Sequence, residues 1–192
     1  MVIVNADDGR LIERTLAGDT QAFGELVLRY QDRLYGTLTH LLGSVHDAHD
    51  VAQDAFIAAF DKLDTFRQES SFYSWLFRIA YHAAVNNRRK QRRHQHLSVE
   101  GQREATGAEP AESRPNDPAA PLESLEDQQR VQEALNELAP EFRDVLIFKE
   151  LEGLRYEEIA VLLEIPLGTV RSRIHRARHE LKEKLSRTPS TG

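Results

Sequence analysis

A compact group of basic and hydroxyl side chains lies near the C-terminus, in a segment that reads as two short helices joined by a tight turn. The second helix has an apolar stripe of Val170, Ile174, Ala177 and Leu181, and its opposite side presents Ser172, His175, Arg176 and His179, flanked by Arg171 and Arg173. Arginine is the commonest bidentate partner of guanine in the major groove, and Arg or Ser can also hold phosphate. This pattern predicts the recognition helix of a helix-turn-helix. The alternative is an ordinary amphipathic helix with a solvated basic face.

A second basic group lies in the N-terminal half, where Arg88, Arg89, Lys90, Arg92 and Arg93 place five positive charges within six residues. It ends a predicted helix whose apolar stripe, Phe72, Trp75, Leu76, Ile79 and Ala83, is most simply core. Tyr73, Phe77 and Tyr81 share another side of that helix. They could pack on a neighbouring helix or remain exposed as stacking platforms for unpaired bases. The basic run suits such a single strand, and its alternative is a solvated helix end stabilised by the helix dipole.

A third group is acidic and falls on a predicted helix that begins after Ser44. Asp47, Asp50, Asp54 and Asp61 share one stripe, and Ala52, Phe56, Ala59, Phe60 and Leu63 share the other. The acidic stripe fits either a solvated face or a docking face for a basic partner helix. His46, His49 and Asp50 lack a further ligand cluster, so neither a metal nor a cofactor is expected. The sequence contains no Gly-rich phosphate loop, nucleophile elbow or H-E-x-x-H motif, and it is not expected to be an enzyme.

The distribution of charge and proline divides the chain. Eight acids and two arginines between residues 97 and 127 account for the whole net charge of −6. Four of the seven prolines also fall there, with almost no large apolar side chains, which predicts an extended, self-repelling linker. We therefore expect an N-terminal domain over residues 1–96, a flexible acidic linker over 97–122 and a C-terminal domain over 123–192.

The elements that would position these groups all read as helices. We expect helices over residues 8–17, from Thr20 as N-cap to Gly43, from Ser44 onward with Asp47 as capping partner, and from Ser70 or Ser71 to about Arg93. In the C-terminal domain they fall at 123–138, 141–152, 156–163 and 167–186. The fold class is all-α, with two small helical domains. Apolar runs are too short to span a bilayer and cysteine is absent, so we expect a cytoplasmic protein without membrane insertion.

Three segments, in order along the chain, resemble an extracytoplasmic-function (ECF) sigma factor of bacterial RNA polymerase, closest to the sigma-E type. Residues 47–56 resemble the polymerase-docking motif of that family. Phe66 and Arg67, followed by residues 72–80, resemble its promoter-melting segment. Residues 154–160 and 167–173 resemble its C-terminal helix-turn-helix.

The resemblance implies a role for each group. The minus-35 element would be read as duplex by Arg171, Ser172, Arg173, His175, Arg176 and Arg178. The minus-10 element would be read as melted single strand by Phe66, Tyr73, His82, Arg88, Arg89, Arg92 and Arg93, with residues 64–71 forming a pocket for a flipped base. Asp47, Asp50, Gln53 and Asp54 would dock on the polymerase. The implied partners are core RNA polymerase, through its clamp and flap, promoter DNA and an anti-sigma factor.

Two positions depart from the family pattern. His82 stands where relatives commonly carry Asn, which affects base preference at minus-10, and Arg155 stands where they often place a Ser or Thr helix cap. A competing interpretation is a two-domain helix-turn-helix regulator with an N-terminal sensing or dimerisation domain. The basic tract in that domain argues against it, because a sensor domain has no need of such a tract.

Overall fold

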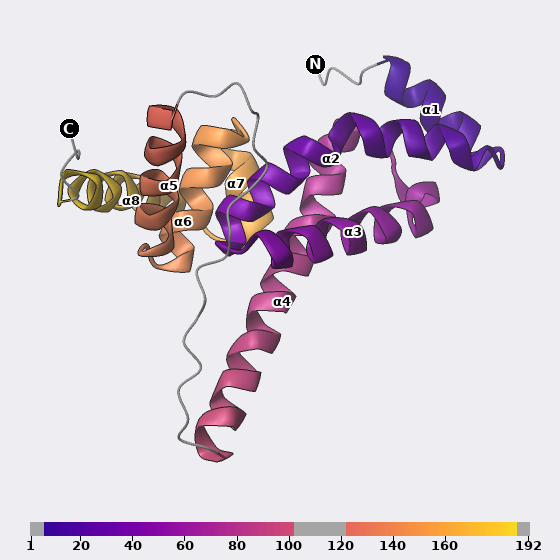
Figure 1. The fold of residues 1–192 in the computed structure, drawn as a ribbon. Helices are drawn as coiled ribbons and strands as arrows, with labels where there is room; N and C mark the ends of the chain where they lie inside the picture. Colours follow the sequence, from indigo (N-terminus) through magenta and orange to yellow (C-terminus); the bar gives the residue numbers. More distant parts are fainter. Residues whose placement is uncertain (1–5, 102–121, 188–192) are drawn as a thin grey trace. The chain divides into compact units, whose positions relative to one another are not determined.

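The computed structural model describes residues 6–101 and 122–187, which fall into two compact units, Met1–Glu112 and Ser113–Gly192 (Figure 1). Helix is the regular structure throughout these described residues, and the all-α prediction is confirmed. None of the helices within them combines the length and the hydrophobicity that crossing a membrane requires. Most of the predicted linker, residues 102–121, lies outside the described part of the chain.

The first unit contains α1 (Ala6–Leu16), α2 (Thr20–Leu42), α3 (Val45–Asp61), a short 3-10 helix η1 (Leu63–Thr65) and α4 (Phe72–Gly101). Asp19, not Thr20, caps α2, because its carboxylate accepts a hydrogen bond of 3.1 Å from the backbone N–H of Gln21. Gly43 ends α2 in the left-handed conformation, at φ 70°, which glycine adopts without a Cβ penalty. The Ser44 hydroxyl then accepts from the N–H of Asp47 and starts α3.

The fourth helix begins as predicted and ends later than predicted. The Ser71 hydroxyl accepts a hydrogen bond of 3.1 Å from the N–H of Ser74 and caps the start of α4. The predicted end near Arg93 is wrong, because α4 continues to Gly101, through the first residues assigned to the linker. The sequence between Arg93 and Gly101 contains no proline or glycine that would interrupt a helix. In Figure 1 this end of α4 projects beyond α2 and α3.

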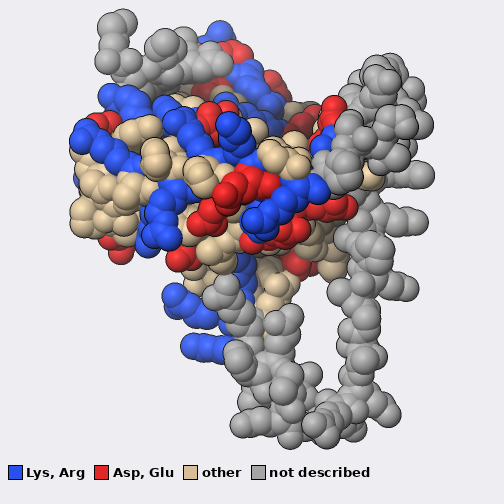
Figure 2. All heavy atoms as spheres, turned by 90° about the vertical axis from the view of Figure 1, so that its left-hand side faces the viewer, with Lys and Arg blue, Asp and Glu red and all other residues tan. Residues whose placement is uncertain are grey.

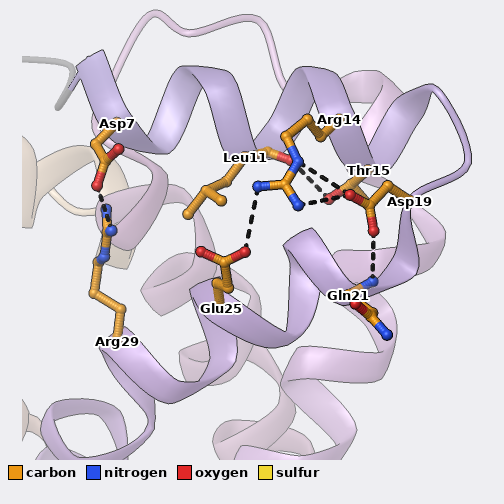
Figure 3. Close-up of polar contacts among 8 residues, drawn as sticks. All are labelled: Asp7, Leu11, Arg14, Thr15, Asp19, Gln21, Glu25 and Arg29. Atoms are coloured by element: carbon orange, nitrogen blue, oxygen red, sulfur yellow. Dashed lines mark hydrogen bonds and ion pairs between the residues drawn. The ribbon is translucent and has the colours of Figure 1, made fainter.

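The core of the first unit forms where α2, α3 and α4 meet. Its largest fully buried side chains are Leu26, Leu34, Leu38, Leu41, Phe72 and Leu76. The first helix lies on α2 and is tied to it by polar contacts (Figure 3). Arg14 bridges Asp19 and Glu25, at 2.7 and 3.3 Å, and Arg29 binds Asp7 at 2.6 Å. Leu11 and Ile12 of α1 are buried.

The second unit contains α5 (Leu122–Asn136), α6 (Pro140–Leu146), a π turn η2 (Ile147–Leu151), α7 (Tyr156–Leu163) and α8 (Leu167–Arg187). The bounds of α7 match the prediction. The single helix expected over 141–152 is instead α-helical only to Leu146. Beyond it the N–H of Glu152 bonds to the carbonyl of Ile147, five residues earlier. Gly153 then turns the chain with φ 67°.

Candidate nucleic-acid interface

The predicted recognition helix, α8, packs against the rest of the second unit with one side. Val170, Ile174 and Ala177 are fully or almost fully buried, and α8 packs on α5, α6 and α7. Ile159 and Leu162 of α7 are buried in the same core. The turn between α7 and α8 passes through Glu164, which has φ 54°, the left-handed conformation that ends α7. This geometry leaves the opposite side of α8 accessible.

The predicted minus-35 residues lie on that accessible side. Arg171, Ser172, His175, Arg176 and Arg178 are exposed, and Arg173 is half-buried. Three of them have partners within the unit. The Ser172 hydroxyl donates to the Thr169 carbonyl at 3.0 Å, and the Arg176 guanidinium lies 5.2 Å from the centre of the Phe142 ring. The remaining contact, an ion pair, involves Arg178.

Arg178 forms the strongest of these contacts. Its Nε and Nη2 both donate to Oε1 of Glu150, at 3.1 and 2.6 Å, and this hydrogen bonding raises the pKa of Arg178 above its usual value. Lys184 of α8 is likewise paired with Glu137, at 2.7 Å, and the Lys184 ammonium lowers the pKa of that carboxyl. On the face of the molecule drawn in Figure 2, acidic and basic side chains are interleaved. The positive charge of this helix is therefore partly neutralised by its own unit.

The basic residues predicted for minus-10 all belong to α4. His82, Arg89 and Arg93 are exposed and Arg88 is half-buried, whereas the side chain of Arg92 lies outside the described residues. His82 contacts the ring of Tyr81, at 6.1 Å between centroids. All of these side chains belong to α4, and the first turn of α4 directly follows the predicted base-binding loop, residues 64–71.

The two aromatic residues of the minus-10 prediction, Phe66 and Tyr73, are buried. Of the two interpretations of the aromatic side of α4, packing on neighbouring helices is therefore correct, and exposed stacking platforms are excluded. Phe66 is 9% exposed and packs against Phe72 and Trp75, with ring centroids 6.0 and 5.2 Å apart. Tyr73 is 5% exposed and lies beneath the guanidinium of Arg33, 3.9 Å from its ring. Phe77 and Tyr81 are buried too. The reason is that α4 packs on both α2 and α3, which buries more than one side of it.

The predicted docking residues follow the outer side of α3. Asp50, Gln53 and Asp54 are exposed, and Asp50 has His46 and His49 nearby, at 3.7 and 4.0 Å. Asp47 is half-buried and accepts a hydrogen bond of 2.8 Å from the Gln91 amide of α4. Within the described residues, His, Asp and Glu side chains do not gather into a group of three that could hold a metal ion.

A groove beside this acidic side was not predicted. It has a volume of about 850 Å³ and runs between α2 and α3, lined mainly by Phe23, Val27, Phe56, Ile57 and Phe60, with Gln53 at its edge. Ile57 is 53% exposed, and Phe60, which belongs to the predicted apolar stripe of α3, is 42% exposed. The sequence contained a sign of this exposed apolar surface, because Ile57 is apolar and lies outside the predicted apolar stripe of α3. The groove places apolar surface next to the acidic side chains.

Comparison with known proteins identifies both units. The sequence matches Sigma-70 region 2 over residues 26–94 and Sigma-70, region 4 over residues 128–181. It is 37% identical to the RNA polymerase sigma-H factor of Pseudomonas aeruginosa, with 96% of each chain covered. It is 39% identical to the ECF RNA polymerase sigma-E factor of Escherichia coli K12, over 93% of this chain and 94% of that one.

Solved structures agree with this comparison. The sigma factor RpoE of Bartonella quintana, in complex with the anti-sigma factor NepR, superposes with a TM-score of 0.67 at 28% identity, covering 85% of this chain and 96% of that one. CnrH in complex with the cytosolic domain of CnrY gives 0.66 at 26% identity, covering 95% and 99%. The region 2 match covers the helices that the competing interpretation assigned to a sensing or dimerisation domain, and it excludes that interpretation. The chain therefore belongs to the sigma-70 family, as an ECF sigma factor of the sigma-E and sigma-H type, which directs RNA polymerase to promoters.

Proposed function

We propose that this sigma factor divides promoter reading between its two units and reaches DNA only after docking on core polymerase. A sigma factor is a non-enzymatic subunit, so its work consists of binding. The observation that carries the proposal is that each separately folded unit has its own exposed basic helix side, on α4 in the first and on α8 in the second.

The second unit reads the minus-35 element as duplex through α8. This is supported by the buried stripe of Val170, Ile174 and Ala177, which holds the helix by its back. Arg171 and Arg176 are the proposed base readers, since both are exposed and a guanidinium can bind guanine O6 and N7 together. Arg173 and Arg178 lie toward the edges of the accessible side of α8 and bind phosphate, with Ser172 and His175 between the two sets.

The first unit captures the melted minus-10 strand beside α4. The loop over residues 64–71 holds a flipped base, and Arg88, Arg89, Arg92 and Arg93 attract the phosphates along the helix. Binding an unstacked base offsets part of the few kcal/mol that unstacking costs, so opening needs no hydrolysis. Because Phe66 and Tyr73 are buried, they support the loop and α4 from beneath, and the direct contacts fall to exposed groups such as His82.

Docking on core polymerase uses the outer side of α3. Asp50, Gln53 and Asp54 are exposed there, next to the apolar groove, and the pairing of acids with an apolar strip fits a basic amphipathic helix of the polymerase clamp. The second unit contacts the flap. Both solved neighbours described above are complexes, one with the anti-sigma factor NepR and the other with the cytosolic domain of CnrY, and we propose that an anti-sigma factor likewise holds this protein in the cytoplasm until it is released.

The test is DNA binding with and without core polymerase. Free protein should bind promoter duplex weakly, and addition of core should give tight binding that is centred on one start site. The promoter is selected by transcription from a library randomised at both elements, and binding is measured by fluorescence anisotropy. Nanomolar, sequence-specific binding by the free chain would contradict the proposal.

A further inference from the structure

A buried carboxylate joins α1 to the rest of the first unit. Asp8 is 1% exposed, and its two oxygens each accept a hydrogen bond of 2.5 Å, one from Arg29 Nη1 and one from the hydroxyl of Tyr30. Burying a charge is costly unless it is paired and hydrogen-bonded, and here both conditions hold. Nothing in the docking or DNA-reading surfaces described above uses this group.

The neighbouring Asp7 shares one of the two partners of Asp8. It binds Arg29 as well, at 2.6 Å, but its side chain is 61% exposed. Arg29 therefore has an alternative partner, whereas the described contact of the Tyr30 hydroxyl is with Asp8. Burial and this hydrogen bond raise the pKa of Tyr30 to about 12, so the hydroxyl keeps its proton and remains a donor at physiological pH.

The Tyr30 ring reaches the beginning of α4. Its centroid lies 5.8 Å from that of Phe72 and 5.5 Å from that of Tyr73. Phe72 in turn contacts Phe66, at 6.0 Å. Phe66 lies within the predicted base-binding loop, residues 64–71, and Phe72 directly follows it, so a single ring cluster supports the loop from both positions. Within that loop Gln68 has φ 56°, a conformation that costs a non-glycine residue free energy and needs support from its surroundings.

We propose that Asp8 is a positioning residue for minus-10 recognition. By holding the Tyr30 hydroxyl it fixes the Tyr30 ring against Phe72 and Tyr73, and thereby sets the shape of the loop that captures the flipped base. The inference rests on the proposed function of residues 64–71. It also assigns a purpose to α1, which contacts η1 at the start of this loop.

Attachment of α1 does not depend on this one hydrogen bond. Leu11 and Ile12 are buried, Arg14 bridges to Glu25, and Asp7 binds Arg29. Loss of the contact between Asp8 and Tyr30 should therefore leave α1 in place and release only the ring. This separates a positioning role from a general contribution to folding.

The experiment measures how strongly holoenzyme senses each base of the minus-10 strand. The probe is a fork-junction DNA from the library-selected promoter, in which each minus-10 base of the non-template strand is removed in turn to leave an abasic site. The variants are Tyr30→Phe, Asp8→Leu and the double mutant, with Asp7→Asn as the matched control. Affinity for core polymerase and thermal unfolding are measured in parallel.

In the wild type, one abasic position should weaken binding strongly. We call this loss of affinity, relative to intact DNA, the abasic penalty. Tyr30→Phe and Asp8→Leu should each reduce the abasic penalty by about tenfold, the effect of one hydrogen bond to a charged group. The double mutant should lose no more than either single mutant, because Asp8 acts through Tyr30. Core affinity should stay within about twofold in all four proteins, and Asp7→Asn should keep the wild-type penalty.

Three results would overturn the inference. The variants could keep the full abasic penalty, the two losses could add in the double mutant, or core binding could fall in parallel with the penalty. The last result would reduce Asp8 to a folding contact. If the wild type itself showed no abasic penalty at any position, base capture by the loop would be wrong, which is a failure of the proposed function and is thus distinguishable.

Discussion

The two helices that we propose to read DNA, α4 and α8, differ in how many of their sides are buried. In the second unit, α8 buries the single stripe of Val170, Ile174 and Ala177 and leaves the rest accessible. In the first unit, α4 packs on α2 and α3 together, so Phe72 and Leu76 are buried and so are Tyr73, Phe77 and Tyr81. A helical wheel therefore predicts the exposed side of α8 correctly, but it does not reveal that the aromatic side of α4 is buried as well. Periodicity identifies an exposed side only on a helix that packs with one face.

The units also differ in how their charge is arranged. Basic residues of α8 have acidic partners in their own unit, as in the pairs of Arg178 with Glu150 and Lys184 with Glu137. The first unit has such pairs between α1 and α2, but its α3 carries four Asp and no Lys or Arg, and the part of α4 from Arg88 to Arg93 is basic. Such segregation suits a unit that must attract both a basic protein surface and a nucleic acid, since each attraction has its own side.

The largest expected effect tests this segregation. Replacing Asp50 and Asp54 together with Lys should abolish association with core polymerase and leave the helical fold intact, because both side chains are exposed. Association is measured by gel filtration and by reconstituted transcription, and folding by circular dichroism. The matched control is Glu133→Lys with Glu183→Lys, an equal change of charge on exposed residues of the second unit. If the α3 variant still supports transcription, its acidic side is merely solvated.

Much of this fold was predictable because its helix ends depend on local chemistry. Ser44, Gly43 and Pro140 each mark a terminus through a cap, a left-handed residue or a fixed φ, and the structure places helix ends there. The groove between α2 and α3 and the burial of Phe66 depend on which helices meet, which periodicity within one segment does not reveal. The buried Asp8 did leave a signal. With Leu11, Ile12 and Thr15 it falls at i, i+3, i+4 and i+7, the buried side of α1.

The second prediction sharpens the roles assigned to α8. Arg171→Ala or Arg176→Ala should cost about 1–3 kcal/mol on a matched minus-35 element, for whichever residue makes a bidentate base contact, and less on a mismatched one. Arg173→Ala and Arg178→Ala should weaken binding evenly across sequences and reduce the salt dependence. Holoenzyme affinity is measured for matched and mismatched elements at several salt concentrations. Equal effects of all four changes on the two elements would contradict the assignment.

A third, smaller effect concerns His82 on α4. It is exposed, so His82→Asn should leave stability and core binding unchanged. Neutral His offers one donor and one acceptor on a rigid ring, whereas the Asn amide can pair with a base edge in two directions. We therefore expect a change in which minus-10 base is preferred. Transcription from a promoter library randomised at minus-10 gives the base profile of each protein. Identical profiles would place base selection in the loop over residues 64–71.

The smallest expected effect returns to the second unit, at the start of α7. Arg155 occupies the N-cap position in an extended conformation, and the Glu158 carboxylate accepts a hydrogen bond of 2.7 Å from its backbone N–H. That is one half of a capping box. The other half needs a side-chain acceptor at position 155, which arginine does not have. Arg155→Ser supplies the acceptor and should raise the Tm of the second unit by about 2–4 °C.

Arg155→Ser adds a cap and also removes the ion pair between Arg155 and Glu158. Measuring stability as a function of pH distinguishes these two effects. Hydrogen bonding from Arg155 lowers the pKa of Glu158, so this stabilisation is present above the usual glutamate pKa and is lost as the pH falls through the lowered value. In acid the wild type has lost its ion pair, and the advantage of Arg155→Ser over it should therefore be larger than at neutral pH. Arg155→Ala, which has neither acceptor nor charge, should be less stable than wild type at neutral pH and approach it in acid. If the Arg155→Ser protein were no more stable than the Arg155→Ala protein at either pH, the serine hydroxyl would not cap α7. The hydrogen bond from the backbone N–H of residue 155 to Glu158 would then be the main stabilisation of the start of that helix.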